Sequence, residues 1–191
     1  MSTFSRDDLE RYLGLLVDEL RGLGANTSVR IVGGAALALR YFERATTTDI
    51  DAMTIGDDEL LGEAVRRVAE GNGLPGDWLN EEARKYVPVW GRMIDWETVY
   101  DRDGVVVQIA PVDTLLAMKL RANRPGRDDK DIARLVAIAG ISGVREAEEL
   151  FESFYPGDSL SDRALRMVER ALEMPPPAMS QPPTIRLEGG S

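Results

Sequence analysis

The sequence predicts an α/β fold in which a small mixed β-sheet is flanked by helices. Three features indicate this class: an amphipathic opening segment, short β-branched runs that alternate with helical patterns, and four consecutive helical patterns after residue 111. Strands that alternate with helices are typical of α/β domains, and the later run of helices adds a helical C-terminal region. A chain of 191 residues is long enough for one such domain with its own core.

The first part of the chain has a regular alternation of patterns. Its opening segment places leucines at helical spacing with charges on the opposite face. A β-branched run is then stopped by Gly33 and Gly34, and a second strand pattern follows three threonines. We expect, in order, a helix over residues 6–23, a strand within 28–34, a helix over 35–44, a strand over 47–55 and a helix over 57–73.

The second part begins with a segment of mixed character, residues 74–91, which we expect to form helix and loop. After it we expect strands over 97–100 and 105–109 joined by the turn-like DRDG, and helices over 113–122, 128–140, 144–155 and 161–174. From Pro175 onward five prolines interrupt any period, which predicts a flexible or polyproline tail. The expected organisation is a domain over residues 1–139, C-terminal helices over 140–174 packed on it, and a Pro-rich flexible tail over 175–191.

Composition excludes several kinds of chemistry. The chain has no cysteine and no histidine, which excludes disulfides, thiolate nucleophiles, His-ligated zinc and a Ser-His-Asp triad. Chemistry must use carboxylates, Lys, Arg, hydroxyls and backbone amides, and hard cations such as Mg²⁺ suit these groups. A net charge of −10 argues against indiscriminate binding to nucleic acid. Without a long apolar run or a signal-peptide pattern, we expect a cytoplasmic protein with no membrane association.

Asp49 and Asp51 lie on either side of one isoleucine in the second predicted strand. Residues two apart on a strand point to the same side with Cα atoms about 7 Å apart, so both carboxylates can meet one ion. Two such charges about 4 Å apart repel by on the order of 4 kcal/mol at an effective dielectric near 20, and a divalent cation reverses that cost. The pair predicts a metal site; the alternative is an exposed strand face with solvated charges.

Gly33 and Gly34 lie between a predicted strand and a predicted helix. Glycines at this place let backbone amides approach a ligand, and the start of a helix favours a phosphate group. The pair therefore predicts a phosphate-binding turn just upstream of the acid pair. The alternative is a tight turn with no ligand.

The stretch VGGAALALRYFERATTTDIDAM, residues 32–53, resembles the signature of the nucleotidyltransferase superfamily, in which a strand, a glycine turn and a helix precede a DxD strand. A later K-L-x-A helix and an R-D-x-x-D segment extend the resemblance to the AbiEii-like nucleotidyltransferases, the toxins of type IV-like bacterial toxin–antitoxin pairs. The resemblance covers about residues 29–135. It implies a nucleotidyltransferase fold and a transfer that depends on Mg²⁺, with Mn²⁺ as an alternative, from an NTP to an acceptor hydroxyl. A tRNA 3′ end is the implied acceptor and an antitoxin protein the implied partner.

The resemblance also assigns roles to residues. Asp49 and Asp51 match the metal ligands, Gly33 and Gly34 the phosphate turn, Lys119 the lysine that contacts the triphosphate, and Asp131, with Asp128, the acidic helix position. In some relatives an antitoxin phosphorylates the hydroxyl residue that matches Thr47. Without the resemblance, Lys119 fits equally a surface lysine extending from an amphipathic helix.

Hydroxyl and basic side chains complete the predicted site. Thr47 and Thr48 adjoin the acid pair and can bind the γ-phosphate or metal-bound water, or simply suit the entry to a strand. Arg124 belongs to a basic cluster around Lys119 that would steer an RNA end or a triphosphate. The alternative for this cluster is a solvated helix face paired with Asp128 and Asp129.

One departure from the family pattern leaves other functions open. Many nucleotidyltransferases carry a third carboxylate on a later strand, where this chain has Gln108, with Asp95, Glu97 and Asp101 as the nearby substitutes. A second hypothesis is therefore an inactive nucleotidyltransferase-like module that acts by binding a protein partner. A third is an enzyme whose acceptor is a small molecule or a protein.

Overall fold

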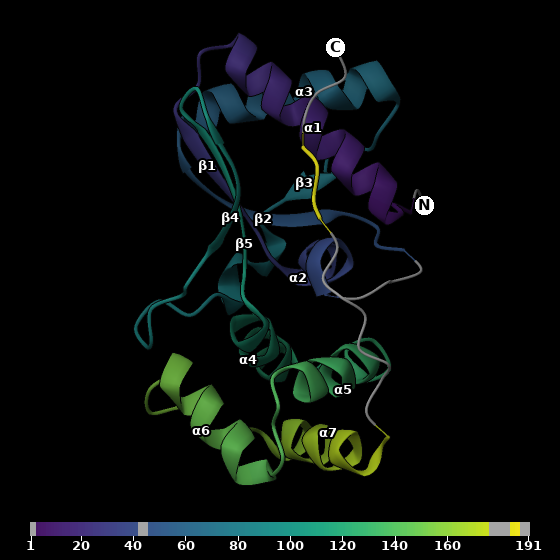
Figure 1. The fold of residues 1–191 in the computed structure, drawn as a ribbon, viewed down its shortest axis with the longest axis vertical. Coiled ribbons are helices and arrows are strands. Elements are labelled where there is room, and N and C mark those ends of the chain that lie inside the picture. Colours follow the sequence, from purple (N-terminus) through teal and green to yellow (C-terminus); the bar gives the residue numbers. More distant parts are fainter. Residues whose placement is uncertain (1–2, 42–45, 176–183, 188–191) are drawn as a thin grey trace. The chain divides into compact units, whose positions relative to one another are not determined.

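The computed structural model describes residues 3–41, 46–175 and 184–187 (Figure 1). The chain forms two compact units. Unit 1 comprises Met1–Arg84, Trp96–Ala110 and Pro182–Ser191, and unit 2 comprises Lys85–Asp95 and Pro111–Gln181. The chain thus passes from one unit to the other four times.

The five strands of unit 1 are β1 (Thr27–Ile31), β2 (Ile50–Gly56), β3 (Leu79–Asn80), β4 (Glu97–Arg102) and β5 (Val105–Ile109). They form one sheet in the order β3-β2-β1-β5-β4. β1 runs antiparallel to β2 and parallel to β5, β2 is parallel to β3, and β4 is antiparallel to β5. A mixed sheet with flanking helices confirms the predicted α/β class (Figure 1).

One face of the sheet is buried and the other is half-exposed. Val29 of β1 and Val107 of β5 are fully buried, because they point into the apolar core. Their neighbours Arg30 and Gln108 point to the opposite side and are half-buried. We call the face that carries Arg30 and Gln108 the polar face of the sheet.

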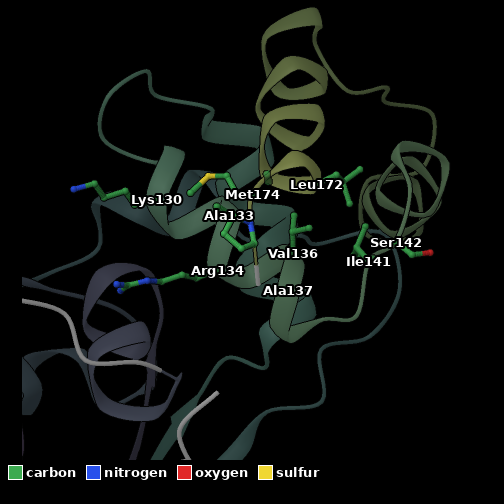
Figure 2. Close-up of a pocket in the computed structure, with 11 residues that line it drawn as sticks. Lys130, Ala133, Arg134, Val136, Ala137, Ile141, Ser142, Leu172 and Met174 are labelled. Atoms are coloured by element: carbon green, nitrogen blue, oxygen red, sulfur yellow. The ribbon is translucent and has the colours of Figure 1, made fainter. Parts of the chain in front are cut away.

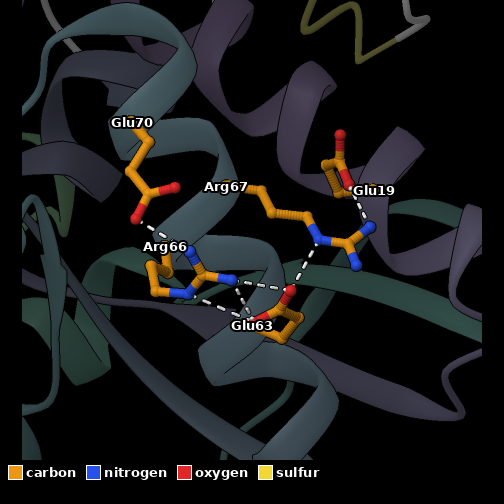
Figure 3. Close-up of polar contacts among 5 residues, drawn as sticks. All are labelled: Glu19, Glu63, Arg66, Arg67 and Glu70. Carbon is orange, nitrogen blue, oxygen red and sulfur yellow. Dashed lines mark hydrogen bonds and ion pairs between the residues drawn. The ribbon is translucent and has the colours of Figure 1, made fainter.

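The helical elements before β4 are α1 (Arg6–Gly22), α2 (Gly33–Ala36), the π-helix η1 (Leu37–Tyr41), α3 (Asp58–Asn72) and the 3-10 helix η2 (Glu82–Tyr86). α1 begins with a capping box in which Ser5 and Asp8 each bind the other's backbone amide, and its leucines are buried. α1 and α3 pack side by side, and Arg67 of α3 links Glu63 to Glu19 of α1 on the surface (Figure 3). Such exposed ion pairs contribute little, so the buried leucine face holds the two helices together.

The helix predicted over residues 35–44 starts earlier and changes form. One α-helical turn, Gly33–Ala36, is followed by the π-helix Leu37–Tyr41, and residues 42–45 lie outside the described part of the chain. Leu37 and Leu39 are fully buried, so the core fixes this segment. Single π-turns inside helices are rare and are not encoded by a simple apolar period.

Unit 2 contains α4 (Val112–Ala122), α5 (Asp129–Ile138), α6 (Val144–Phe154) and α7 (Asp162–Glu173). All four helices were predicted at these places. α5 packs against both α4 and α7, and α6 also contacts α4 and α7. The division between compact units therefore falls after Ala110, whereas the sequence predicted a boundary after residue 139. The apolar stripe of α5 is covered by helices of its own unit, which is why α4 and α5 group with α6 and α7.

The described part of the predicted tail packs on unit 1. Leu187 is only 3% exposed, and the Thr184 carbonyl accepts a hydrogen bond from the Arg6 guanidinium at 3.3 Å. Residues 184–187 therefore differ from the predicted flexible tail, because one leucine in a polar segment provides an anchor. In the described part of the chain, every helix is too short or too polar to cross a membrane.

Candidate functional site

Asp51 lies on β2 with its side chain close to the start of α2. The Val32 amide donates to the Asp51 carbonyl at 2.9 Å, so the pairing of β1 with β2 continues up to the residue before Gly33. On the other side, Asp51 pairs with Asn80 of β3, and the Ala83 amide donates to Asp51 Oδ1 at 3.2 Å. Backbone from two neighbouring segments thus fixes the place of this carboxylate.

Gly33 lies close to the Asp51 carboxylate. Its φ is +64°, in the left-handed region that favours glycine. A Cβ atom at this position would lie 2.6 Å from Asp51 Oδ2. Gly33 therefore makes the tight turn that was the alternative interpretation, and it also leaves room for the carboxylate. Gly34 follows it inside α2 and does not share the positive φ.

Asp49 is half-buried and lies just before β2. Its carboxylate accepts hydrogen bonds from Asn80 Nδ2 and from Thr48 Oγ1, both at 3.3 Å. Both donors are neutral, and no lysine or arginine among the described residues lies within 4.0 Å of Asp49. Thr47 is buried, and its hydroxyl donates to the Asp49 carbonyl at 3.2 Å. The structural role thus accounts for Thr47, while Thr48 is exposed and contacts the acid itself.

The acid pair site, defined as Gly33, Asp49, Asp51 and Asn80, fits a hard cation by its chemistry. Mg²⁺ prefers oxygen ligands, is commonly held by one or two carboxylates and completes its shell with water and substrate phosphates. Among the described residues no group of three acids or other metal-ligating side chains is placed to hold an ion. Asp49 and Asp51 are the carboxylates of this site that could hold such an ion.

Two of the residues considered for the third carboxylate, Gln108 and Glu97, have partners within the protein. Gln108 on β5 accepts from Arg30 Nε at 2.9 Å and donates to Thr98 Oγ1 at 3.1 Å. Glu97, one of the named substitutes, forms an ion pair with Arg40 at 2.7 Å. These partners explain both side chains without a metal.

Lys119 of α4 belongs to a buried ionic group in unit 2. It is 6% exposed, and its ammonium lies 2.8 Å from Asp128 Oδ1 and 2.9 Å from Asp131 Oδ2. The surface-lysine alternative is therefore wrong. Asp128 and Asp131 are also buried, and they come from the start of α5, so the three residues join two helices.

Arg124 completes this group, which we call the lysine cluster: Lys119, Arg124, Asp128 and Asp131. Arg124 Nε lies 3.0 Å from Asp128 Oδ2, and the Arg124 backbone amide donates to the same oxygen at 3.0 Å. Burial raises the pKa of the Asp128 carboxyl, but the bonds from Arg124 and the charge of Lys119 outweigh it and hold that pKa below its usual range. Asp128 is therefore ionised at neutral pH.

The wider basic cluster predicted around Lys119 is partly neutralised within unit 2. Arg121 forms an ion pair with Asp158 and lies over the ring of Tyr155, with its guanidinium carbon 4.5 Å from the ring centroid. The solvated-face interpretation paired Asp129 with this cluster. In the structure Asp129 instead forms an ion pair with Arg170 at 3.1 Å. Arg124 pairs with Asp128 as the alternative expected, but Asp128 is buried rather than solvated.

A separate groove of about 600 Å³ lies between α5 and α7 (Figure 2). Val136, Ala137 and Leu172 give it apolar walls, and Lys130 and Arg134 extend at one end. No carboxylate is found among its described lining residues. The groove is thus distinct from both predicted groups of site residues.

The structure gathers the predicted residues into two groups, one in each unit, and adds residues that sequence reasoning missed. Asn80 bonds Asp49, and the Ala83 amide bonds Asp51. Neither has a periodic signal, because β3 is only two residues long. The nearby Trp78, fully buried with Nε1 donating to the Val65 carbonyl at 3.1 Å, was the visible sign that this segment packs in the core.

Comparison of the chain with protein-family models, with curated proteins and with solved structures gave no match.

Proposed function

We propose that this chain is a Mg²⁺-dependent nucleotidyltransferase that moves a nucleotidyl group from an NTP to an acceptor hydroxyl. The observation that supports this best is the acid pair site. Asp51 lies against Gly33, where a Cβ would come within 2.6 Å of its carboxylate, and the donors to Asp49 among the described residues are neutral. Carboxylates held in this way next to a glycine turn suit a metal-bound polyphosphate.

In this proposal each group has a defined task. Asp49 and Asp51 hold the ion, and the backbone amides of Gly33 and Gly34 donate to phosphate oxygens. Mg²⁺, when bound, offsets the negative charge of the phosphates. The acceptor oxygen bonds to the α-phosphorus, the bond to the β-phosphate oxygen breaks, and pyrophosphate and the hydroxyl proton leave.

Lys119 has a narrower role in the proposal than the resemblance implies. Its ammonium donates a hydrogen bond to Asp128 and forms an ion pair with Asp131, and both contacts lie within unit 2. The lysine cluster also joins α4 to α5, so loss of activity on changing Lys119 would not by itself establish catalysis.

The acceptor and the biological role are proposed from the family resemblance. A tRNA 3′ end is the first acceptor to test, in keeping with a toxin that is controlled by an antitoxin protein. A protein or a small molecule is the alternative acceptor.

The test is incubation with Mg²⁺, each labelled NTP in turn and total tRNA, with label scored in RNA and in protein. Asp51→Asn keeps the size of the side chain and should reduce labelling at least about 100-fold, because it removes a metal-binding charge. Glu59→Gln removes one exposed charge from α3, and this variant should transfer as much label as the wild-type protein does. Equal labelling by Asp51→Asn would refute the proposal.

A second function, a binding module without turnover, is favoured by one observation. Gln108 occupies the strand position where a third acid is expected and is held by Arg30 and Thr98. NTP affinity measured with and without Mg²⁺ separates the two functions. An enzyme should bind NTP much more tightly with the ion, whereas a binding module should show little difference.

A further inference from the structure

Arg30 lies on the polar face of the sheet, close to the acid pair site. It is directly opposite Met53 of β2, and Met53 and Asp51 are two residues apart on that strand. Directly opposed residues share a face, and so do residues two apart along a strand. Arg30 and Asp51 are therefore diagonal neighbours on one face, with Cα atoms about 7 to 8 Å apart.

Neutral groups hold the Arg30 guanidinium in place. Its Nε donates to Gln108 Oε1 at 2.9 Å, and Gln108 in turn donates to Thr98 Oγ1 at 3.1 Å. The guanidinium carbon also lies 5.0 Å from the centroid of the Trp96 ring. This arrangement fixes the plane of the guanidinium but supplies no negative charge.

Arg30 has no carboxylate within 4.0 Å among the described residues, although the chain has 33 acidic residues. The other half-buried arginines described in unit 1, Arg6 and Arg40, hold Glu10 and Glu97 at 3.0 and 2.7 Å. Burial lowers the pKa of the Arg30 guanidinium, because desolvation disfavours the charged form. A half-buried cation of this kind is stabilised when an anion reaches it.

We propose that Arg30 binds a phosphate group of the substrate on the polar face of the sheet. Its two terminal nitrogens make no hydrogen bond to the described residues, and they form a planar fork that matches two phosphate oxygens. A phosphate can bind Arg30 and a metal ion at the acid pair together.

This inference rests on the proposed function for the identity of the ligand as a nucleotide substrate. The phosphate has two sources, the triphosphate of the NTP or the backbone of an RNA acceptor. Both present the same oxyanion to the guanidinium, so the experiment uses one probe for each source.

The experiment measures binding of inorganic tripolyphosphate with Mg²⁺, and separately binding of a short 5′-phosphorylated oligoribonucleotide, by titration calorimetry. Arg30→Gln should weaken at least one probe by about 10- to 100-fold, because a charge-assisted hydrogen bond is lost. Arg11→Gln, which removes an exposed charge from the same unit, should change neither probe by more than about twofold. Loss of tripolyphosphate binding identifies the NTP as the source, and loss of oligonucleotide binding identifies the acceptor.

A second variant keeps the test decisive if Arg30→Gln fails to fold. Arg30→Lys retains the charge but not the planar fork, and it should give an intermediate loss. Unchanged binding of both probes by a folded Arg30 variant would overturn the inference. Because binding needs no turnover, Arg30-dependent binding without labelling of any acceptor would reject the proposed transfer and leave the inference standing. If labelling depends on Asp51 but not on Arg30, and the Arg30 variants bind both probes normally, the inference about Arg30 is rejected and the proposed transfer stands.

Discussion

Gly33 and Gly73 have nearly the same backbone conformation but different surroundings. Their φ values are +64° and +65°. A Cβ at Gly73, which caps α3, would meet nothing within 4 Å, whereas one at Gly33 would meet the Asp51 carboxylate at 2.6 Å. Alanine substitutions at the two positions can therefore be compared. Both introduce an unfavourable φ, but only the one at Gly33 disturbs the acid pair site.

We expect Gly33→Ala and Gly73→Ala to lower the free energy of unfolding by similar amounts, about 1 kcal/mol each. The Asp51 carboxylate can rotate away from a new methyl group, so the clash should cost function more than stability. Mg²⁺-dependent NTP binding should weaken about 10- to 100-fold in Gly33→Ala only. Urea unfolding and calorimetry measure both effects, and NTP binding by Gly33→Ala equal to that of Gly73→Ala would contradict this role for Asp51.

Single residues also show where the sequence was informative. The strand alternation placed Asp51 on the half-exposed face, and the two glycines correctly marked the end of a strand. Arg30 gave no such signal, because its environment is created by Gln108 and Trp96 from far along the chain. Contacts between distant residues cannot be inferred from local patterns.

Among the helices, α4 and α5 are joined by the lysine cluster rather than by packing alone. Asp128 and Asp131 are nearly inaccessible to solvent, and Lys119 is the cation that both contact. Removal of one partner leaves buried charge without compensation, which is far more costly than loss of a surface pair. The ionic group thus stabilises the junction of these two helices.

We expect Lys119→Met to lower the free energy of unfolding by about 3 to 5 kcal/mol at neutral pH. Arg145→Met, which breaks an exposed pair with Glu149 on α6, should have little effect. Urea unfolding curves of the two variants provide the comparison. Equal stability of both variants would mean that Lys119 is not a structural cation.

The same cluster should respond to acid. Because the pKa of Asp128 is lowered in the folded protein, its contribution to stability is fully present above the unfolded pKa near 3.9. That contribution is lost as the pH falls from about 4 through the folded pKa. The difference between the unchanged chain and Lys119→Met should therefore be constant above about pH 4 and shrink below it.

Most elements were predictable because each carries its own period or breaker. Of the seven α-helices in the described residues, six are long segments found where expected, and the β4–β5 hairpin turns at Asp103 and Gly104, both with positive φ. β3 was missed because two residues contain no alternation, and it exists only through pairing with β2. The π-helix η1 was missed because burial of its leucines, rather than a sequence period, determines its form.

At the scale of the whole molecule, each unit is built from separate stretches of the chain. Unit 1 includes residues before and after the helices of unit 2, and Leu187 supplies a late apolar contact to it. The sequence suggested a boundary between residues 139 and 140, because the family resemblance ends near Leu135 and helix-to-helix contacts are not visible in a sequence.

We expect Leu187→Ala to lower the free energy of unfolding by about 2 to 4 kcal/mol, as for other buried leucines. Val89→Ala, at a side chain that is 76% exposed, should change it little. Thermal and urea unfolding test the difference. A Leu187→Ala protein as stable as the unchanged chain would show that residues 184–187 do not anchor on unit 1.

The repeated passage of the chain between its units also determines the order of assembly during synthesis. The sheet strands are made before α4, and Thr184–Leu187 follows only after all four helices of unit 2 have been made. At about 5 to 20 residues per second, several seconds separate these events. During that interval the nascent chain presents the surface that Leu187 later covers, which gives a chaperone or a newly made partner protein a limited time in which to bind it.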